Sequence, residues 1–390
     1  MTRMLVQKKI KICQVCAVDF TFEYFLNQLI LKQKKIGWDV TCLSSKGKYL
    51  NYLNRIGFKV KAINIARDYN IIDKFNTIIL FYNYFKKEKF DIIHTHTPLA
   101  SMLVRIACLF IKKSKVVYTA HGFYFHENMN YFSYNFFLFI EKFLSLFTKL
   151  TFIQSKEDYK IANKKFYNKQ NIFCIGNGIN LKRFNPKKVI KKNIKKIQKK
   201  YGLNNDLFIV GMICRLVEEK GVIEFLEASY LFSKEEKNFK AILIGKRIKN
   251  EHSKSIQKKI NQYKRLMGSK LIITGEVKNV EDYLKLFSVF CLPSYREGLP
   301  RSIIEAMSMK LPVITTNIRG CRELIKNNIN GFIVPIKNSR SIYYKIKMLN
   351  KFENVRKKMG FINFKKVKLF HNEDKIVNKQ NVLISKLYHD

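Results

Sequence analysis

Residues 292–317 read LPSYREGLPRSIIEAMSMKLPVITTN, and this stretch decides the fold. An apolar run ends at Pro293, and a short loop then carries Arg296, Glu297 and Gly298. The spacing of the next apolar residues predicts a helix from about Pro300, and a β-branched run follows at residues 312–316. A strand, a helix and a strand in this order predict a βαβ unit, whose loop lies at the carboxyl edge of a parallel sheet.

The same alternation extends along the whole chain. Short, near-continuous apolar runs are separated by helical patterns, as expected for parallel strands covered by helices on both faces. Predicted strands are residues 9–18, 39–44, 59–65, 91–96, 115–121, 150–154, 171–175, 208–214, 241–245, 271–275, 289–293, 312–316 and 331–334. The predicted fold class is therefore α/β, with two Rossmann-like domains of about six strands each.

A domain boundary is predicted in residues 184–201, FNPKKVIKKNIKKIQKKY, where the strand pattern is interrupted. Ile190, Ile194, Ile197 and Tyr201 recur at the spacing of one helix face, between pairs of lysines. This basic helix is either a solvated outer surface or a contact with anionic lipid. We predict a first domain over residues 1–184, a second over 185–372 and a further helical segment over 373–390.

Composition excludes several classes of protein and favours anionic partners. The hydrophobic fraction of 47% excludes a globally disordered chain, and only 6 Pro and 16 Gly exclude collagen-like or linker-dominated architectures. The net charge of +45 favours phosphorylated ligands, nucleic acid or an acidic membrane surface, although biased coding for Lys is the alternative. Cys13 and Cys16 form a single CxxC within a predicted strand, so we expect buried thiols rather than a zinc site.

The sequence contains no predicted membrane span or secretory leader. No charge-free apolar stretch reaches the ~18 residues of a span, and the first fifteen residues lack the apolar core of a signal peptide. Residues 129–150, MNYFSYNFFLFIEKFLSLFTKL, form an apolar helix with one polar stripe at Glu141, Ser145, Thr148 and Lys149. Such a helix is either buried in the core or partly inserted at a membrane surface.

A second group of charged residues lies in residues 211–221, GMICRLVEEKG. Arg215 and Lys220 leave the predicted strand 208–214 at the same sheet edge as the 292–317 loop, and two cations beside a helix N-terminus are typical of a diphosphate site. Glu297 and Glu305 could face this crevice about 10 Å apart, given a rise of 1.5 Å per helical residue. A carboxylate there can accept hydrogen bonds from vicinal hydroxyls.

These segments resemble the family 4 glycosyltransferases, retaining enzymes of the GT-B fold with two Rossmann-like domains facing across a cleft. The similarity extends from about residue 9 to 350. The segments AVDFTFEYFLNQLI and AHGFYF are most similar to the branch that builds bacterial capsule, exopolysaccharide or lipid-linked oligosaccharide. The matching segments are RLVEEKG at 215–221, REGLPRSIIEAM at 296–307, NGF at 330–332, HTHTPLASMLVR at 94–105, YTAHGFYFHE at 118–127 and IGNGINLKRF at 175–184.

The resemblance implies four catalytic residues. Arg215 and Lys220 bind the donor diphosphate and neutralise the charge that develops as it leaves. Glu297 contacts hydroxyls of the transferred sugar, and His121, at the end of a first-domain strand, contacts the donor sugar or its phosphate. The implied mechanism is attack on the same face of the sugar, with the departing phosphate taking the acceptor proton. Glu297 is not expected to be a covalent nucleophile, since nothing indicates the pair of carboxylates ~5 Å apart that retaining glycosidases use.

The resemblance also implies a donor site and an acceptor side. Besides the residues above, Gly298 and Leu299 offer backbone N–H groups to sugar or phosphate, and Glu305 accepts from the ribose hydroxyls. Where many relatives carry a Gly-Gly loop after the first strand, this chain has residues 17–21, AVDFT, so Asp19 or Thr21 is expected to contact the acceptor instead. The resemblance implies that the second domain binds the nucleotide sugar and that the first domain lies on the acceptor side. It also implies that the segment 373–390 packs back on the first domain.

We expect neither a metal nor a cofactor. His94 and His96 alternate in a strand, but two histidines do not complete a metal site and no Asp-x-Asp pair adjoins them. The predicted function is transfer of N-acetylhexosamine or hexose from a nucleotide sugar to a lipid-linked or polysaccharide acceptor. The favoured donor is a UDP-sugar. The protein is expected to be cytoplasmic and peripheral at the inner face of the cell membrane, on an anionic surface.

Two other classes of function compete with this prediction. A sugar-nucleotide epimerase shares the fold but needs no acceptor, and REGLPRSIIEAM argues against it. A nucleic-acid-binding protein would explain the positive charge, but no helix-turn-helix, zinc finger or RNP signature is present, so we expect no nucleic-acid partner.

Overall fold

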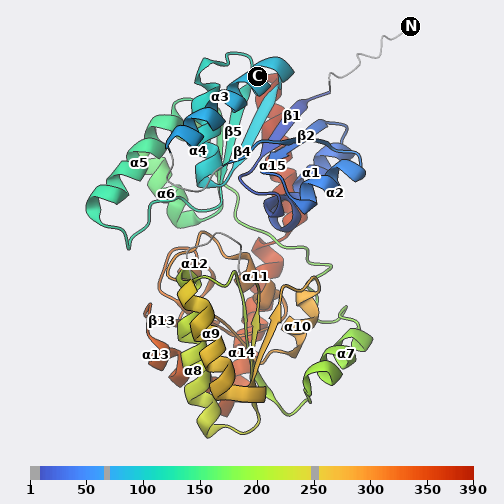
Figure 1. Ribbon diagram of the computed structural model, residues 1–390, viewed down its shortest axis with the longest axis vertical. Coiled ribbons are helices and arrows are strands. Elements are labelled where there is room, and N and C mark those ends of the chain that lie inside the picture. The colour runs from blue at the N-terminus through green and yellow to red at the C-terminus, as the bar shows by residue number, and fades with distance from the viewer. Residues whose placement is uncertain (1–8, 66–70, 247–253) are drawn as a thin grey trace. The chain divides into compact units, whose positions relative to one another are not determined.

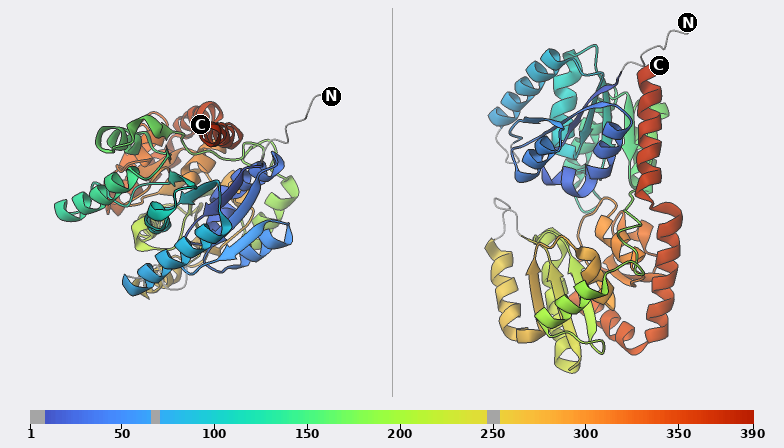
Figure 2. Two further views of the ribbon diagram at one scale, coloured as in Figure 1. Left: turned by 90° about the horizontal axis from the view of Figure 1, so that it is seen from above. Right: turned by 90° about the vertical axis from the view of Figure 1, so that its right-hand side faces the viewer.

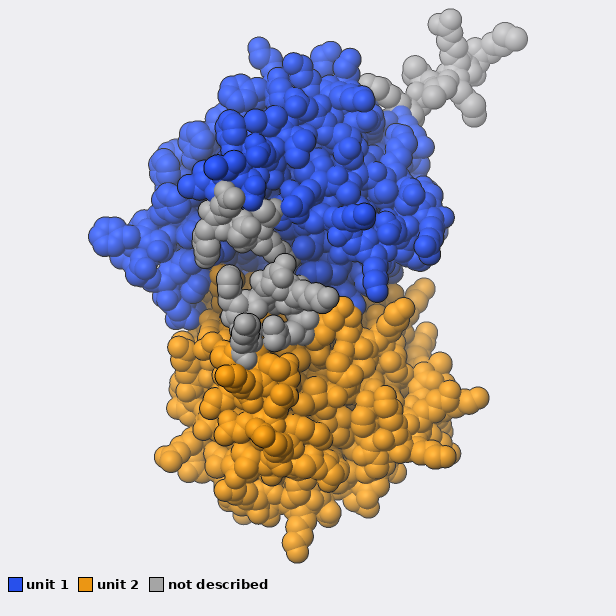
Figure 3. Space-filling model, in the orientation of Figure 1, with its two compact units in different colours: residues 1–176, 374–390 blue, residues 177–373 orange. Residues whose placement is uncertain are grey.

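The computed structural model describes residues 9–65, 71–246 and 254–390. The chain divides into two compact units, coloured separately in Figure 3. Unit 1 comprises residues 1–176 and 374–390, and unit 2 comprises residues 177–373. The boundary predicted from the sequence lies after residue 184. The expectation that no secretory leader is present falls partly on residues 1–8, which lie outside the described residues.

Unit 1 contains a seven-stranded parallel sheet with the order β3-β2-β1-β4-β5-β6-β7 (Figure 1). Its strands are β1 (Lys11–Val15), β2 (Asp39–Ser44), β3 (Lys59–Ala62), β4 (Ile92–His96), β5 (Lys115–Ala120), β6 (Leu150–Ile153) and β7 (Ile172–Cys174). Its helices are α1 (Asn27–Lys35), preceded by a π-helical turn at Phe22–Leu26, α2 (Lys48–Arg55), α3 (Ile71–Glu88), α4 (Pro98–Ala107), α5 (Tyr131–Ser145) and α6 (Lys156–Lys165).

Unit 2 contains a six-stranded parallel sheet with the order β10-β9-β8-β11-β12-β13. Its strands are β8 (Phe208–Ile213), β9 (Phe239–Ile244), β10 (Leu271–Gly275), β11 (Val289–Leu292), β12 (Val313–Thr316) and β13 (Gly331–Val334). Its helices are α7 (Lys191–Tyr201), α8 (Val222–Glu235), α9 (Lys254–Met267), α10 (Val280–Leu286), α11 (Arg301–Ser308), α12 (Cys321–Leu324), α13 (Ser339–Lys351) and α14 (Glu353–Phe370).

Both sheets have the strand order of a Rossmann-like fold, so the predicted α/β class is confirmed. In each sheet the chain winds outward in one direction from the first strand and then in the other. The order therefore reverses between β1 and β4 in unit 1, and between β8 and β11 in unit 2. Ligands of open α/β sheets bind beyond the carboxyl ends of the strands at such a switch point.

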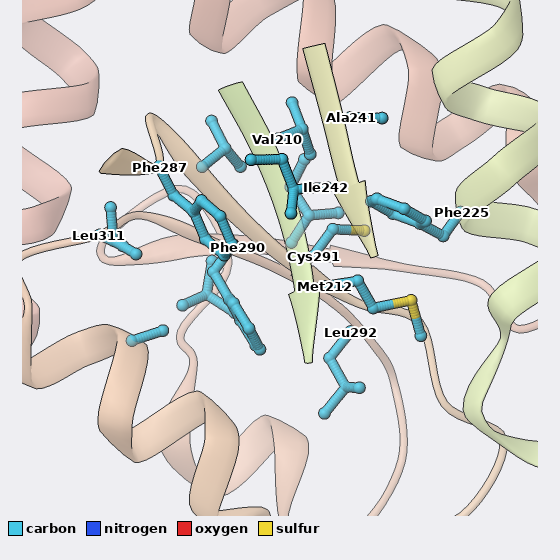
Figure 4. Close-up of a cluster of buried hydrophobic side chains, with 14 of the residues drawn as sticks. Val210, Met212, Phe225, Ala241, Ile242, Phe287, Phe290, Cys291, Leu292 and Leu311 are labelled. Atoms are coloured by element: carbon cyan, nitrogen blue, oxygen red, sulfur yellow. The ribbon is translucent and has the colours of Figure 1, made fainter. Parts of the chain in front are cut away.

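The core of unit 2 forms around β8, β9 and β11, whose side chains are apolar on both faces (Figure 4). Val210 and Phe290 are fully buried, as expected for strands covered by helices on both sides. At Gly211 an added Cβ would lie 1.8 Å from the Phe287 ring, so this ring packs directly on the strand backbone. Close packing on both faces fixes the strand ends that carry the candidate site.

Helix α15 (Glu373–His389) completes unit 1 after the chain has passed through unit 2. From residue 374 onward it belongs to unit 1, along which it extends in Figure 2. Val377 and Ile384 are buried in the same cluster as the strands of that sheet. Lys115 Nζ donates to the Leu387 carbonyl at 2.6 Å. Unit 1 is thus assembled from two separate segments of the chain.

The interpretation that helix α5 lies in the core is correct for only part of its apolar surface, which includes Leu138 and Leu144. The residues that are buried include Glu141 and Ser145, which belong to the polar stripe. The Arg105 guanidinium on α4 donates to Glu141 at 2.8 Å, and both side chains are almost fully buried, with 1% and 6% of their surface exposed. Leu138 and Leu144 are buried beside them, but the helix exposes Tyr131, Phe132, Phe136, Phe139 and Phe143, and Leu146 and Phe147 just after the helix are exposed as well.

Helix α7 is amphipathic, as the sequence predicts, with Ile197 buried and its lysines facing outward. It begins at Lys191, and Ile190 just before it is 60% exposed rather than part of the apolar face. Among the described residues, no helix combines the length and apolar character that crossing a membrane requires.

Candidate active site

The candidate donor residues of unit 2 come together at the switch point of its sheet. Arg215 and Lys220 follow β8, and Glu297 follows β11, the neighbouring strand. Lys220 Nζ lies 2.8 Å from Glu297 Oε1, and both side chains are largely buried, with 14% and 13% exposed. The Ser294 hydroxyl donates to the same carboxylate oxygen at 2.9 Å. A cation and a carboxylate are therefore held side by side at the sheet edge.

Arg215 is more exposed than Lys220 and is held by a different carboxylate. Its guanidinium lies 3.0 Å from Glu219, which also accepts from Arg296 at 3.3 Å. Because about a third of each of these side chains is exposed, solvent weakens both ion pairs. The two arginines thus bring positive charge to the loops that follow β8 and β11.

Two glycines allow these loops to approach each other closely. Gly221 has φ +71°, and an added Cβ would lie 2.1 Å from the Pro293 carbonyl oxygen. Gly320, at the start of α12, has φ +74°, and its Cβ would lie 1.5 Å from the Gly298 carbonyl oxygen. Only glycine adopts these dihedral angles without strain and leaves room for the facing carbonyls. The loops carrying Lys220 and Glu297 are therefore positioned by direct backbone contact.

Backbone N–H groups are available beside these charges. The N–H groups of Gly298 and Leu299 donate to no acceptor within the described ranges. The Leu299 carbonyl is held by the Asn177 side chain at 2.9 Å, and Asn177 is buried. A fixed loop with two unpaired N–H donors directly before helix α11 can donate to a polar or anionic ligand, and the contact with sugar or phosphate oxygens stays a prediction.

Glu305 lies on α11 and is paired with arginine rather than with the Lys220–Glu297 group. Arg301 Nε lies 3.4 Å from Glu305 Oε1, and the other end of the guanidinium lies 2.9 Å from Glu373. Burial raises the pKa of the Glu305 carboxyl from 4.5 to about 7, against the opposing effect of Arg301 and Arg183. A carboxyl that is costly to ionise and close to arginines is well suited to accept hydrogen bonds from a polar ligand.

The remaining predicted residues belong to unit 1. His121 follows β5, and its Nε2 lies 3.3 Å from Nδ1 of the buried His96. Asp19 accepts a hydrogen bond from the Tyr49 N–H at 2.7 Å, so its carboxylate caps the first turn of α2. Thr21 is buried beside the π-helical turn. The two candidate acceptor residues thus have local structural contacts, and their role toward an acceptor stays a prediction.

Two family models match the chain, glycosyl transferase 4-like over residues 14–155 and glycosyl transferases group 1 over residues 193–365. The galactosyltransferase of Escherichia coli named UDP-Gal:alpha-D-GlcNAc-diphosphoundecaprenol alpha-1,3-galactosyltransferase is 30% identical over 79% of this chain and 79% of its own length. The chain belongs to the group 1 glycosyltransferases. The predicted family membership is therefore confirmed.

Two further comparisons support this glycosyltransferase assignment. The capsular polysaccharide biosynthesis glycosyltransferase CapM of Staphylococcus aureus is 28% identical over 92% of this chain and 93% of its own length. The crystal structure of a glycosyltransferase from Rickettsia africae has a TM-score of 0.77, with 23% identity over 98% of this chain and 99% of that one. This likeness confirms the GT-B architecture of two Rossmann-like halves.

Several residues that hold the site of this glycosyltransferase in place were not predicted from the sequence. Ser294 and Asn177 act on Glu297 and on the Leu299 carbonyl, and both are buried. Gln14, buried in β1, contacts both His94 and His96. A polar residue inside an otherwise apolar strand, such as Gln14, is a signal that sequence alone contains. The contacts of Ser294 and Asn177 exist only in the folded unit.

No group of three His, Cys, Asp or Glu side chains in the described part of the glycosyltransferase could hold a metal ion. His94 and His96, the pair considered as ligands from the sequence, are fully buried in β4 and hydrogen-bonded to other side chains. Independence of metal and cofactor stays a prediction, which assays with chelators can test.

Proposed function

We propose that the chain is a retaining, metal-independent glycosyltransferase without a cofactor, which transfers N-acetylhexosamine or hexose from a UDP-linked donor. The proposed acceptor is a lipid-linked or polysaccharide glycan of the cell surface. The names of the relatives support this choice, because the E. coli enzyme uses a UDP-galactose donor and a diphosphoundecaprenol acceptor, and the S. aureus enzyme serves capsule biosynthesis. We propose no nucleic-acid partner.

The contact between Lys220 and Glu297 carries this proposal. Because the two groups are 2.8 Å apart, one ligand that carries a phosphate beside a hydroxyl would reach both Lys220 and Glu297. A sugar diphosphate has this arrangement. Arg215 and Lys220 stabilise the diphosphate as it departs, and preorganised cations at developing negative charge are usually the largest contribution to catalysis.

The proposed reaction needs no protein nucleophile. The bond between the anomeric carbon and the diphosphate oxygen breaks, and the acceptor oxygen bonds to the same face of the sugar. The departing phosphate oxygen takes the acceptor proton. Glu297, with the N–H groups of Gly298 and Leu299, orients the sugar hydroxyls, Glu305 accepts from the ribose, and His121 contacts the sugar or its phosphate.

The experiment is a transfer assay with a panel of UDP- and GDP-sugars and polyprenyl-diphosphate-linked acceptors, read by mass spectrometry. We expect one UDP-sugar to be transferred, in the presence of a chelator, with retained configuration by NMR. Lys220→Ala should lower turnover about 10²–10³-fold, the usual effect of removing one such contact. Lys347→Ala on α13, an exposed lysine paired with Glu235, serves as the matched control and should retain wild-type turnover.

Four outcomes would contradict the proposal. An inverted product excludes the retaining mechanism, and loss of activity with the chelator excludes metal independence. Conversion of the donor alone into an epimer would assign the chain to the isomerases. Equal rates for wild type and Lys220→Ala would remove Lys220 from the site.

We also propose that the exposed face of α5 docks the enzyme on an anionic membrane surface, at the inner face of the cell membrane. Phe132, Phe136, Phe139 and Phe143 recur at helical spacing and are 84%, 60%, 64% and 43% exposed. Burying a phenylalanine side chain is favourable by about 1.5–3 kcal/mol, so several together suffice for reversible insertion. The net charge of +45 complements anionic headgroups.

Sedimentation with vesicles tests this docking. The protein should bind vesicles that contain anionic lipid, and Phe136→Ser with Phe139→Ser should weaken binding at least about tenfold, as the loss of roughly 1.4 kcal/mol or more requires. The matched control is Phe361→Ser with Phe370→Ser on α14, whose rings are 48% and 65% exposed. Equal binding of all three proteins would exclude α5 as the docking surface.

A further inference from the structure

A row of buried polar side chains leads through unit 1 to His121. Gln14 on β1 and the two histidines of β4 are all fully buried. Gln14 Nε2 lies 3.2 Å from His94 Nδ1, and Gln14 Oε1 lies 2.8 Å from His96 Nε2. His94 Nε2 in turn lies 2.7 Å from the Thr119 hydroxyl on β5. Each ring nitrogen of His94 therefore has a hydrogen-bond partner.

The positions of donors and acceptors set the direction of these bonds. Because Gln14 Oε1 can only accept, His96 carries its proton on Nε2 and leaves Nδ1 as an acceptor. His96 Nδ1 then accepts from His121 Nε2 at 3.3 Å. The ring of His121 is held by this bond on one side and by the edge of the Phe25 ring on the other, with centroids 6.2 Å apart.

The row continues to the C-terminal helix. Gln14 Nε2 also donates to Gln33 Oε1 on α1 at 2.8 Å. Gln33 Nε2 donates to Asn381 Oδ1 on α15 at 3.0 Å, and both residues are buried. Buried polar groups cost free energy unless they are paired, so the bonds of Gln14 and Gln33 favour one arrangement of these side chains, whereas the Asn381 amide nitrogen has no partner among the described residues. Gln14 is therefore held on three sides.

Both histidines of β4 are kept neutral. Burial lowers the pKa of His94 to about 3, and burial lowers the pKa of His96 as well. A neutral His96 retains the lone pair on Nδ1 that the bond to His121 requires. The row thus provides a permanent acceptor at a fixed position beside His121.

We infer that Gln14 and His96 are positioning residues for His121, fixing its ring orientation and holding its proton on Nε2. The inference rests on the proposed function, in which His121 contacts the donor. Gln14 fixes the tautomer of His96, and His96 fixes that of His121. Misplacing a reacting group by about 1 Å can cost about 10²-fold in rate, so the effect appears in kcat.

Substitutions at His96 separate positioning from packing. In His96→Asn the side-chain amide oxygen can take the place of ring Nδ1 and accept from His121. In His96→Gln the longer side chain places its amide near the position of Nε2, so no acceptor faces His121. We expect His96→Asn to keep most of kcat, and His96→Gln and His96→Leu to lose about 10²-fold, with the donor KM little changed. Thr95→Val is the matched control, because Thr95 is equally buried in β4 and its hydroxyl has no hydrogen-bond partner among the described residues.

A double-mutant cycle and NMR complete the test. Added to His121→Ala, His96→Leu should cause no further loss of kcat. In histidine-labelled protein, ¹⁵N shifts should report an Nε2–H tautomer for His121 in wild type and in His96→Asn but not in His96→Leu. Equal losses in Thr95→Val and His96→Leu, additive losses in the cycle, or an unchanged tautomer would overturn the inference alone. An unchanged kcat in His121→Ala would overturn the proposed role of His121 and the inference with it.

Discussion

Substituting Glu305 by Gln should remove a pH-dependent destabilisation of unit 2. Burial raises the pKa of Glu305 from 4.5 to about 7, and the side chain is only 14% exposed. The folded protein therefore holds this proton more tightly than the unfolded chain does. As the pH rises from about 4.5 to 7, the unfolded chain releases the proton first, so stability falls through this window and is constant above it.

The size of the effect follows from the pKa difference. One pKa unit corresponds to about 1.4 kcal/mol, so a rise from 4.5 to about 7 corresponds to about 3 kcal/mol at pH 8. Glutamine does not ionise, so the Glu305→Gln variant does not lose this stability as the pH rises. For a unit of this size, 1 kcal/mol shifts the melting temperature by about 2–4 °C, so the variant should gain roughly 6–12 °C on wild type between pH 4.5 and 8.

The assay is differential scanning calorimetry of wild type and Glu305→Gln at both pH values. Glu353→Gln on α14 is the control, because Glu353 is exposed and the hydrogen bond from Lys357 lowers its pKa. This control should gain no stability at pH 8. Parallel pH dependences in wild type and Glu305→Gln would refute the reasoning, because the buried carboxyl would then ionise as it does in the unfolded chain.

Three further predictions concern the scaffold. Arg105→Met should destabilise unit 1 by about 3–5 kcal/mol in urea unfolding, because Glu141 is left buried and unpaired. Adding Glu141→Leu should restore most of this stability, and an equal loss in the single and the double variant would contradict the prediction. Gly320→Ala should lower the free energy of unfolding by more than about 1 kcal/mol and weaken UDP binding measured by calorimetry. Gly202→Ala is the control, because Gly202 has φ +61° but no atom within 4 Å of an added Cβ, and it should leave UDP binding intact. Unaltered UDP binding in both variants would contradict the role of the loop contact. Ser294→Ala should lower turnover about 2–10-fold, the equivalent of one hydrogen bond to Glu297, and an unchanged rate would exclude that role.

The positions of the strands could be predicted because a buried parallel sheet leaves a local signal in the sequence. In the described part of the chain every strand from β1 to β13 coincides with a predicted strand, and most of these are near-continuously apolar because they are buried on both faces. Strand β3 is the exception, since it is largely exposed and carries Lys59 and Lys61. The grouping of Arg215, Lys220 and Glu297 was also predictable, since the carboxyl ends of neighbouring parallel strands meet at one edge.

What the sequence left open depends on contacts between distant residues. The pattern of residues 129–150 separates an apolar face from a polar one but does not say which faces inward. Arg105, which decides this for α5, lies 36 positions from Glu141. Likewise Gln33 and Asn381 are 348 positions apart, so no local pattern links them. The pairing of Glu305 with Arg301 follows from helical spacing, but its burial does not.

The two-segment construction of unit 1 has a consequence for biosynthesis. A ribosome completes the seven strands of unit 1 first, then makes all of unit 2, and only afterwards makes α15. Before α15 is made, Gln33 and the apolar surface of unit 1 that later packs against Val377 and Ile384 are open to water. Unit 2 is continuous and can fold as it emerges, whereas the contacts of unit 1 with α15 can form only at the end of synthesis. Until that point chaperones would meet on unit 1 the apolar surface that α15 later covers.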